Sequence, residues 1–235
     1  MDYEPKIALS FSRLSDYEQC PFKFKSKYID KSYPDDSDNP AFIKGNKIHK
    51  QLEDYVSFLQ SQDRDEDKRP IMGTYTEPVV PMIDKLWDAS GGRMFPEKQI
   101  AVDQDWELCS WYDKPHQVKY RVIVDCLVFL SDRELLVIDW KSGKVRPYED
   151  GPRTQLKLTA LILFNLYPKV EKITCAYMFV EHKETVKAEF QVSEMESIRE
   201  EFEAAHKEVN IASDFPYKKN RYCNWCLAPN CPIRA

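Results

Sequence analysis

Residues 135–144, with the sequence LLVIDWKSGK, decide how the fold of this chain is interpreted. Four apolar residues run into Asp139, and Lys141 follows two positions later, just before a Ser-Gly turn. Because successive side chains on a β-strand point to opposite faces, an acid and a lysine two positions apart share one face. The stretch therefore predicts a strand that ends in a carboxylate beside an ammonium group. Taken alone, this pattern is better explained by a surface ion pair than by a functional site.

A second acid, Asp125, lies inside the apolar run VIVDCLVF of residues 122–129. This run is apolar on both faces, which predicts a central strand of a sheet. An ionised carboxylate inside such a strand is costly unless it is paired with another group or binds a metal ion. Asp125 therefore needs a partner, and strand pairing offers Asp139 as the candidate.

The length of the loop between the two strands decides whether these acids meet. If the loop holds an odd number of residues, 131–133, Leu130 faces Glu134 and Asp125 lies directly opposite Asp139. Lys141 then lies two residues further along on the same face. An even loop would place the two acids on opposite faces of the sheet and would exclude a shared site, unless a bulge intervened.

Two carboxylates at that separation repel each other, and a divalent cation between them relieves the repulsion. Oxygen ligands favour Mg²⁺ or Mn²⁺ over Zn²⁺. We expect such an ion to hold a phosphate oxygen and an attacking water, with Lys141 orienting or deprotonating that water. Gln155 lies in the first turn of the next helix, where its amide would bond to the water or to a phosphate. A local excess of positive charge predicts DNA contacts from Lys144, Arg153 and Lys157, although each alone is more typical of an ordinary surface.

Composition sets the outer limits of this interpretation. The chain has 235 residues, of which 43% are hydrophobic and 31% charged, with a formal net charge of −5. No apolar run has membrane-spanning length and the N-terminus lacks a signal sequence, so we expect a cytoplasmic protein that does not bind membranes. Seven cysteines in a reducing compartment favour metal or core roles over disulfides.

The hydrophobic spacing predicts a mixed α/β chain with one central sheet. Helices are expected over residues 12–19, 41–62, 79–89, 151–166 and 193–209, the last with a capping box of Ser193 and Glu196. Strands are expected over residues 98–102, 106–112, 118–130, 134–139, 172–180 and 185–192. The tail from residue 212 shows no periodicity.

That tail contains Cys223, Cys226 and Cys231, in the pattern C-x2-C-x4-C. A structural zinc site or a cubane iron–sulfur cluster would need a fourth ligand. Among the remaining cysteines, three lie in apolar strands (Cys109, Cys126 and Cys175) and are interpreted as small core residues. Cys20, followed by a proline, lies in a loop-like context near the other end of the chain.

At this point the chain resembles a known family. Asp125, Asp139, Lys141 and Gln155 resemble the core of the PD-(D/E)xK nucleases, in the RecB-like exonuclease branch. The resemblance implies a restriction-endonuclease-like fold, with a central mixed sheet flanked by helices. It also implies that His49, which alone would carry little weight, binds the same metal and that the backbone carbonyl of Trp140 completes the coordination. The motif that carries this is Gly45-x3-His49 with Leu52-Glu53.

Two positions depart from the pattern of that family. Thr159 stands where the family usually has a tyrosine, which puts a DNA contact at this position in doubt. Ile123 stands where a glycine is often found, two residues before the first acid.

The cysteines carry the resemblance further. CRISPR-associated RecB-like nucleases and AddB-type helicase–nuclease subunits have one cysteine before the nuclease core and three after it, joined by a [4Fe–4S] cluster. The segment around Cys20 resembles the start of that pattern through Ser10, Ser12, Tyr17, Cys20, Pro21 and Phe24. The resemblance therefore implies a cluster on Cys20, Cys223, Cys226 and Cys231, with structural Zn²⁺ as the alternative. It further implies one nuclease domain over 1–235, with a core at about 41–210 and a cluster lobe of residues 9–30 and 212–235.

Together these features predict a metal-dependent exonuclease that hydrolyses DNA from its ends, 5′→3′, on single and also double strands. The short chain is typical of a stand-alone nuclease of the phage or recombination type. One alternative is a nuclease of CRISPR adaptation that works with an integrase. The other is a non-catalytic protein that binds DNA ends on the same fold, and the complete set of two acids and a lysine argues against it.

Overall fold

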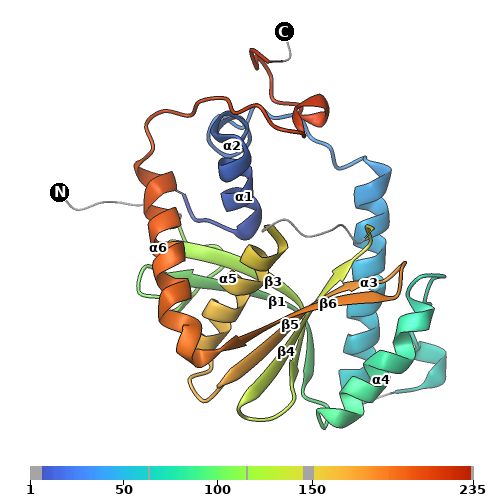
Figure 1. The fold of residues 1–235 in the computed structure, drawn as a ribbon. Helices are drawn as coiled ribbons and strands as arrows, with labels where there is room; N and C mark the ends of the chain where they lie inside the picture. The colour runs from blue at the N-terminus through green and yellow to red at the C-terminus, as the bar shows by residue number, and fades with distance from the viewer. Residues whose placement is uncertain (1–6, 63, 115, 145–150, 234–235) are drawn as a thin grey trace. The chain divides into compact units, whose positions relative to one another are not determined.

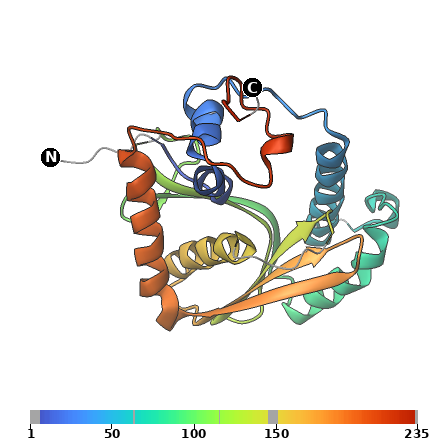
Figure 2. The same cartoon turned by 45° about the horizontal axis from the view of Figure 1, so that its top comes forward.

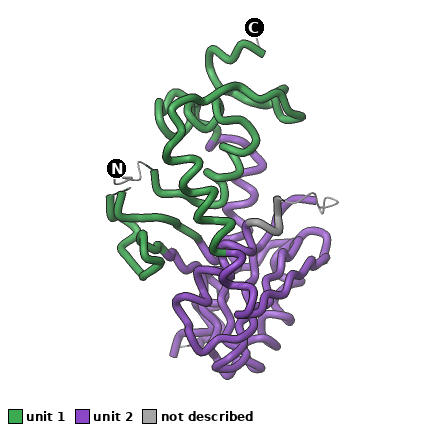
Figure 3. Tube along the Cα trace, turned by 60° about the vertical axis from the view of Figure 1, so that its left-hand side comes forward, with its two compact units in different colours: residues 1–36, 101–122, 199–235 green, residues 37–100, 123–198 purple. Residues whose placement is uncertain are grey.

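The computed structural model describes residues 7–62, 64–114, 116–144 and 151–233, with the backbone alone for 151–154. The chain divides into two compact units (Figure 3). The first unit consists of Met1–Asp36, Ala101–Val122 and Arg199–Ala235, and the second consists of Ser37–Ile100 and Ile123–Ile198. Each unit is therefore built from segments that are far apart in the sequence.

One six-stranded sheet has the order β2-β1-β3-β4-β5-β6 (Figure 1). Strand β4 pairs antiparallel with β3 and parallel with β5, so the sheet is mixed, as the sequence predicts. Helix α5 (Gly151–Leu166) is the crossover between the two parallel strands. The strands are β1 (Met94–Asp103), β2 (Leu108–Cys109), β3 (Val118–Phe129), β4 (Glu134–Lys141), β5 (Lys172–Phe179) and β6 (Glu184–Gln191).

The register of the β3–β4 hairpin confirms the odd loop. Cys126 pairs with Ile138 and Phe129 with Leu135. The backbone N–H of Leu130 donates to the carbonyl of Glu134 at 3.0 Å. The same register places Asp125 opposite Asp139 at the end of the hairpin where the catalytic chemistry was expected.

The core of the second unit lies between the sheet and two helices, α3 (Pro40–Gln60) and α4 (Val80–Ala89). Helix α3 begins at a proline in its first turn, and the side chain of Asn39 caps it. Its apolar residues recur at helical spacing, and all of them are buried against β3 and β4, as predicted: Ile48, Leu52, Tyr55, Val56 and Leu59. Helix α5 lies on the opposite side of these strands (Figure 2).

The first unit contains α1 (Phe11–Gln19), α2 (Pro21–Phe24), a π-helical turn (Lys25–Ile29) and most of α6 (Met195–Ile211). Side chains far apart in the sequence join these segments. The Tyr120 hydroxyl donates to the carbonyl of Phe202 at 2.7 Å, and Asn210 bonds to the backbone of Ile7. Phe24 stacks on Phe215 at 6.3 Å between ring centroids.

Short 3₁₀ turns complete the secondary structure, at Glu66–Lys68, Glu77–Val79, Val192–Glu194 and Cys223–Trp225. No helix in the described part of the chain is both long and apolar enough to cross a lipid bilayer.

The local structure differs from the expectations at three places. Helix α1 begins at Phe11, one residue before the expected start, and Ser10 caps it through a hydrogen bond from the N–H of Arg13. A capping box joins Gln191 and Glu194 at the 3₁₀ turn that leads into α6, two residues before the expected pair of Ser193 and Glu196. The strand expected over 106–112 shrinks to Leu108–Cys109, because the φ of Trp106 is 67° and its backbone belongs to a turn.

Candidate functional site

The hairpin of β3 and β4 brings the first candidate side chains together. One oxygen of Asp125, Oδ2, accepts a hydrogen bond from the backbone N–H of Trp140 at 2.9 Å. The same oxygen lies 3.3 Å from Nδ1 of His49, which α3 supplies. Asp125 therefore has the partners that a carboxylate in an apolar strand needs, and both come from residues that the sequence had assigned to the site.

Asp139 is the more buried of the two acids, with 9% of its surface exposed. The Lys141 ammonium lies 2.7 Å from its Oδ1, and the Gln155 amide Nε2 donates to its Oδ2 at 2.8 Å. The Tyr177 hydroxyl donates in turn to Oε1 of Gln155 at 3.3 Å. The ring of Tyr177 also lies 4.9 Å from the Lys141 ammonium. Lys141 and Gln155 thus contact the carboxylate directly, and Tyr177 contacts both of them.

The sheet explains why these groups meet. Residues 139 and 141 share one face of β4 because side chains alternate, and the parallel register pairs Asp139 with Tyr177 on β5. Helix α5 begins over that face, which brings Gln155, in its second turn, above the acid.

The two acids change the pKa of their neighbours. Burial raises the pKa of Asp139 to about 6, and the charge of Asp125 adds to the rise, while Lys141 and His49 oppose it. Burial of the imidazole lowers the pKa of His49, but the carboxylates of Asp125 and Asp139 outweigh burial, so that this pKa lies above its usual 6.5. Both shifts mean that the site takes up protons more readily than its isolated groups would.

One atom of this site fits a cation. Oδ1 of Asp139 is buried, and among the described residues no donor forms a hydrogen bond with it. The Lys141 ammonium lies 2.7 Å from this oxygen, so the atom already lies beside one positive charge. The described residues nevertheless hold no group of three or more His, Cys, Asp or Glu side chains close enough to hold a metal ion as they stand. His49, Asp125 and Asp139 would have to draw closer around an ion.

Close contacts also join α3 to the end of β4 and β5. A Cβ added to Gly45 would lie 3.2 Å from Oγ of Ser142, so glycine allows the helix to approach this turn. The Lys44 ammonium lies 2.7 Å from Oε2 of Glu181. No sequence pattern indicated Glu181 or Tyr177, because only the β4–β5 register brings residues that follow α5 to this edge.

The residues expected to contact DNA differ in how far their side chains are exposed. Lys144 is exposed and Lys157 is half-buried, whereas the side chain of Arg153 lies outside the described residues. Thr159 is 5% exposed, and its hydroxyl donates to the carbonyl of Gln155 at 3.1 Å. The Thr159 side chain thus faces the interior of its unit and serves its own helix.

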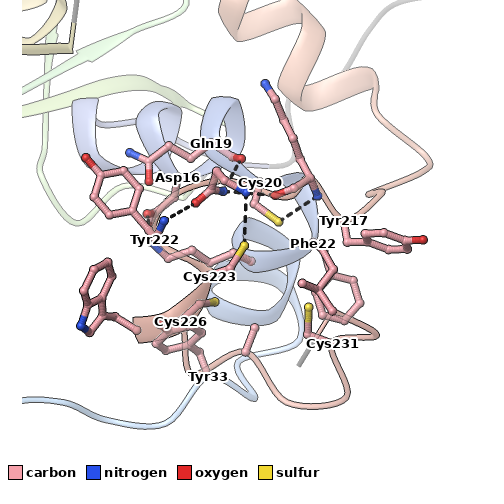
Figure 4. Close-up of a pocket in the computed structure, with 16 residues that line it drawn as sticks. Asp16, Gln19, Cys20, Phe22, Tyr33, Tyr217, Tyr222, Cys223, Cys226 and Cys231 are labelled. Carbon is pink, nitrogen blue, oxygen red and sulfur yellow. Dashed lines mark hydrogen bonds and ion pairs between the residues drawn. The ribbon is translucent and has the colours of Figure 1, made fainter. Parts of the chain in front are cut away.

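A pocket in the first unit is lined by four cysteines, Cys20, Cys223, Cys226 and Cys231 (Figure 4). Two of the thiols accept backbone hydrogen bonds: Cys20 from the N–H of Lys218 at 3.4 Å, and Cys223 from the N–H of Asn220 at 3.3 Å. The structure thus brings both ends of the chain to one pocket. Within the described residues, no three of these thiols lie close enough together to hold a single metal ion.

The other three cysteines lie in strands. Cys126 and Cys175 are fully buried, and burial raises the pKa of each thiol, so both are inert core residues at neutral pH. Cys109 is half-buried, and burial raises its pKa as well. All seven cysteines lie in the described part of the chain and have free thiols.

Three comparisons with known proteins were informative to different degrees, and the family model is the one that identifies a family. The model of a family described as the PD-(D/E)XK nuclease superfamily matches residues 8–231. No curated protein matches the chain significantly. A solved structure described as the crystal structure of SSO0001 is 13% identical, with a TM-score of 0.45, and the match covers 97% of this chain and 87% of that chain.

Proposed function

Because the chain belongs to the PD-(D/E)XK nuclease superfamily, we propose that it is a divalent-metal-dependent exonuclease that hydrolyses DNA from its ends, 5′→3′. Membership implies metal-dependent nuclease activity on DNA, and members of the superfamily usually use Mg²⁺ or Mn²⁺. The choice of DNA ends, the polarity and the action on single and double strands are our own additions. They follow the resemblance to the RecB-like branch.

The observation that carries the proposal is the meeting of Asp125, Asp139 and Lys141 at one end of the β3–β4 hairpin. Nothing in the packing of the sheet requires two carboxylates to lie opposite each other, and their repulsion is a cost. A catalytic role is the simplest reason for the chain to maintain that arrangement. The buried Oδ1 of Asp139, which has an ion pair with Lys141 but no hydrogen bond among the described residues, supports the same conclusion.

We assign the ligands of the ion to His49, Asp125, Asp139 and the backbone carbonyl of Trp140. When bound, Mg²⁺ or Mn²⁺ would polarise the scissile phosphate and make its bound water more acidic. Lys141 orients the attacking water and stabilises the negative charge that develops on the phosphate. Gln155 holds the Asp139 carboxylate in the required orientation, and Tyr177 holds Gln155.

For the first unit we propose a [4Fe–4S] cluster on Cys20, Cys223, Cys226 and Cys231, with structural Zn²⁺ as the alternative. Four thiols that line one pocket support this assignment, because either centre needs four sulfur or nitrogen ligands. Absorbance in the visible region and iron content of anaerobically purified protein would favour the cluster. Colourless protein that contains zinc would favour the alternative.

The nuclease proposal is tested with DNA labelled at the 5′ or the 3′ end, in single-stranded, duplex and closed circular form, with Mg²⁺, with Mn²⁺ or without added metal. We expect shortening of linear DNA from the 5′ end, and no cutting of circles. The variant Asp139→Ala should lose the activity while Tyr112→Ala, which changes an exposed side chain, keeps it. Cleavage of closed circles would exclude an exonuclease, and activity in Asp139→Ala would exclude the metal mechanism.

A further inference from the structure

The segment of residues 217–225, with the sequence YKKNRYCNW, alternates basic and aromatic side chains. It holds Lys218, Lys219 and Arg221, and residues 215–233 contain no aspartate or glutamate. The whole chain, in contrast, has a net charge of −5. Positive charge is therefore concentrated in this segment, which we call the basic aromatic segment.

Its aromatic side chains are exposed in a way that packing does not explain. Trp225 is 73% exposed and Tyr217 is 54% exposed. Large aromatic side chains normally bury most of their surface, so two exposed ones on one short segment need a reason. A ligand that packs against these two rings would bury their exposed surface.

The three basic residues of the segment, Lys218, Lys219 and Arg221, are exposed. The Lys218 ammonium donates to the backbone carbonyl of Glu18 at 2.9 Å, so it serves the fold. Lys219 and Arg221 are exposed, and the Arg221 guanidinium lies 5.1 Å from the ring of Tyr222. Asp16 lines the same cysteine pocket as Tyr217 and Trp225, and it is paired with Lys23 at 2.7 Å, so its charge is already balanced.

The backbone of the segment is fixed before any ligand binds. The Asn220 amide donates to the carbonyl of Gln19 at 3.0 Å, and its side-chain oxygen accepts from the N–H of Tyr222 at 2.8 Å. Beyond the segment, the N–H of Leu227 donates to the hydroxyl of Tyr33 at 2.9 Å. A surface held in this way loses little conformational entropy when a ligand orders it.

From these observations we infer that the basic aromatic segment binds single-stranded DNA, with bases stacked on Trp225 and Tyr217 and phosphates paired with Lys219 and Arg221. This inference rests on the proposed nuclease function, which supplies DNA as the ligand. Aromatic rings reach the faces of bases only where the strand is unpaired, and stacking accepts any sequence. A duplex would offer phosphates to the two cations but no base faces to the rings.

The test measures binding in the full-length Asp139→Asn variant, so that the DNA is not cut. A fluorescein-labelled single strand of twelve nucleotides is titrated without added divalent metal, and its anisotropy gives the Kd. We expect Trp225→Ala to raise the Kd by about 5-fold to 150-fold, which corresponds to the loss of one stacked base. Trp225→Phe should stay within about threefold of the parent, because a phenyl ring still stacks.

The charges are tested through the salt dependence of binding. Removing Lys219 and Arg221 together should lower the slope of log K against log salt by roughly 1.4, since each phosphate contact on a single strand contributes about 0.7. The matched control removes Lys85 and Lys187, two exposed lysines of the other unit, and should leave the slope unchanged. Tyr112→Ala, which removes a ring of the first unit that is 87% exposed, should leave the Kd unchanged.

Three results would overturn the inference. The Kd of Trp225→Ala for the single strand could be unchanged, or Trp225→Phe and Trp225→Ala could lose equal affinity. Trp225→Ala could also raise the Kd for a blunt duplex as much as the Kd for the single strand. Iron and zinc content, measured for every variant, shows whether the cysteine pocket is intact. If Trp225→Ala has lost its metal, the Kd of Trp225→Phe is compared with the parent instead. Failure here is separable from failure of the nuclease proposal. If the wild-type protein cuts DNA and the Trp225 variants bind DNA normally, only the inference is refuted. If the protein binds DNA without cutting it, only the nuclease proposal is refuted.

Discussion

Replacing Gln155 with leucine removes the amide that holds the most buried acid of the site. Gln155 Nε2 donates to Asp139 Oδ2 at 2.8 Å, and the carboxylate is 9% exposed, so water cannot replace the lost bond fully. A hydrogen bond to a charged group contributes about 1.5–3 kcal/mol, which converts to a loss of roughly 10-fold to 150-fold. Loss of a group that orients a metal ligand typically costs about 10-fold to 100-fold in affinity or activity, so the two estimates agree.

The assay is kcat/KM on linear DNA together with the Kd for Mn²⁺, in wild type and Gln155→Leu. Tyr177→Phe is the graded control, because it removes a neutral bond of 3.3 Å one step further from the acid. Its expected cost is about 0.5–1.5 kcal/mol, or roughly 2-fold to 13-fold. Circular dichroism checks that both variants fold. A Gln155→Leu enzyme within twofold of wild type, or a larger effect from Tyr177→Phe, would refute the role assigned to Gln155.

Three further predictions concern protons and thiols. The affinity for Mn²⁺ should fall by at least about tenfold between pH 7.5 and 5, because the raised pKa values of Asp139 and His49 let protons compete with the ion; calorimetry showing equal affinity at both values would contradict this. Burial lowers the pKa of His206 to about 4 from 6.5, so the unfolded chain binds more protons as the pH falls through that window and stability is lost there. Between pH 7.5 and 5 the wild type should lose about 2 kcal/mol more than His206→Phe in urea unfolding, and equal losses would show that this histidine is not the cause. Cys223→Ser should lose bound iron or zinc and unfold at a lower temperature, while Cys109→Ser keeps its metal; full metal content in Cys223→Ser would exclude the cysteine pocket as the binding site.

Local patterns in the sequence predicted most elements of the fold. The five apolar residues of α3 recur at one helical spacing, and the strand before Asp139 is bounded by clear turn signals, so both were found. The capping box of Gln191 and Glu194 was not predicted, because this pair has the same three-residue spacing as Ser193 and Glu196 and spacing alone does not choose between them. The strand at β2 was predicted too long, since the turn around Trp106 depends on the bonds of Asp103 to the N–H groups of Asp105 and Glu107.

The candidate site was predictable as far as strand register extends. Because strands have a fixed period of two, the sequence reduced the meeting of Asp125 and Asp139 to one condition, an odd loop, and the observed register meets that condition. The partner of Gln155 was not predictable, since the rotation of α5 about its own axis depends on packing across the sheet. The contact of Tyr177 required the parallel register of β4 and β5, which no short motif encodes.

The electrostatics of this site explain why an ion belongs there. Asp125 and Asp139 bring two negative charges to one hairpin end, whereas Lys141 is the cation within reach of Asp139 and His49 is neutral unless protonated. The raised pKa of Asp139 and the raised pKa of His49 express the same imbalance, because in each case a proton supplies the positive charge that the two carboxylates lack. A divalent cation supplies that charge instead, so its binding should release protons at a pH near these pKa values. Proton release on Mn²⁺ binding, larger at pH 6 than at pH 8, would therefore report directly on the pair of acids from which the fold was first inferred.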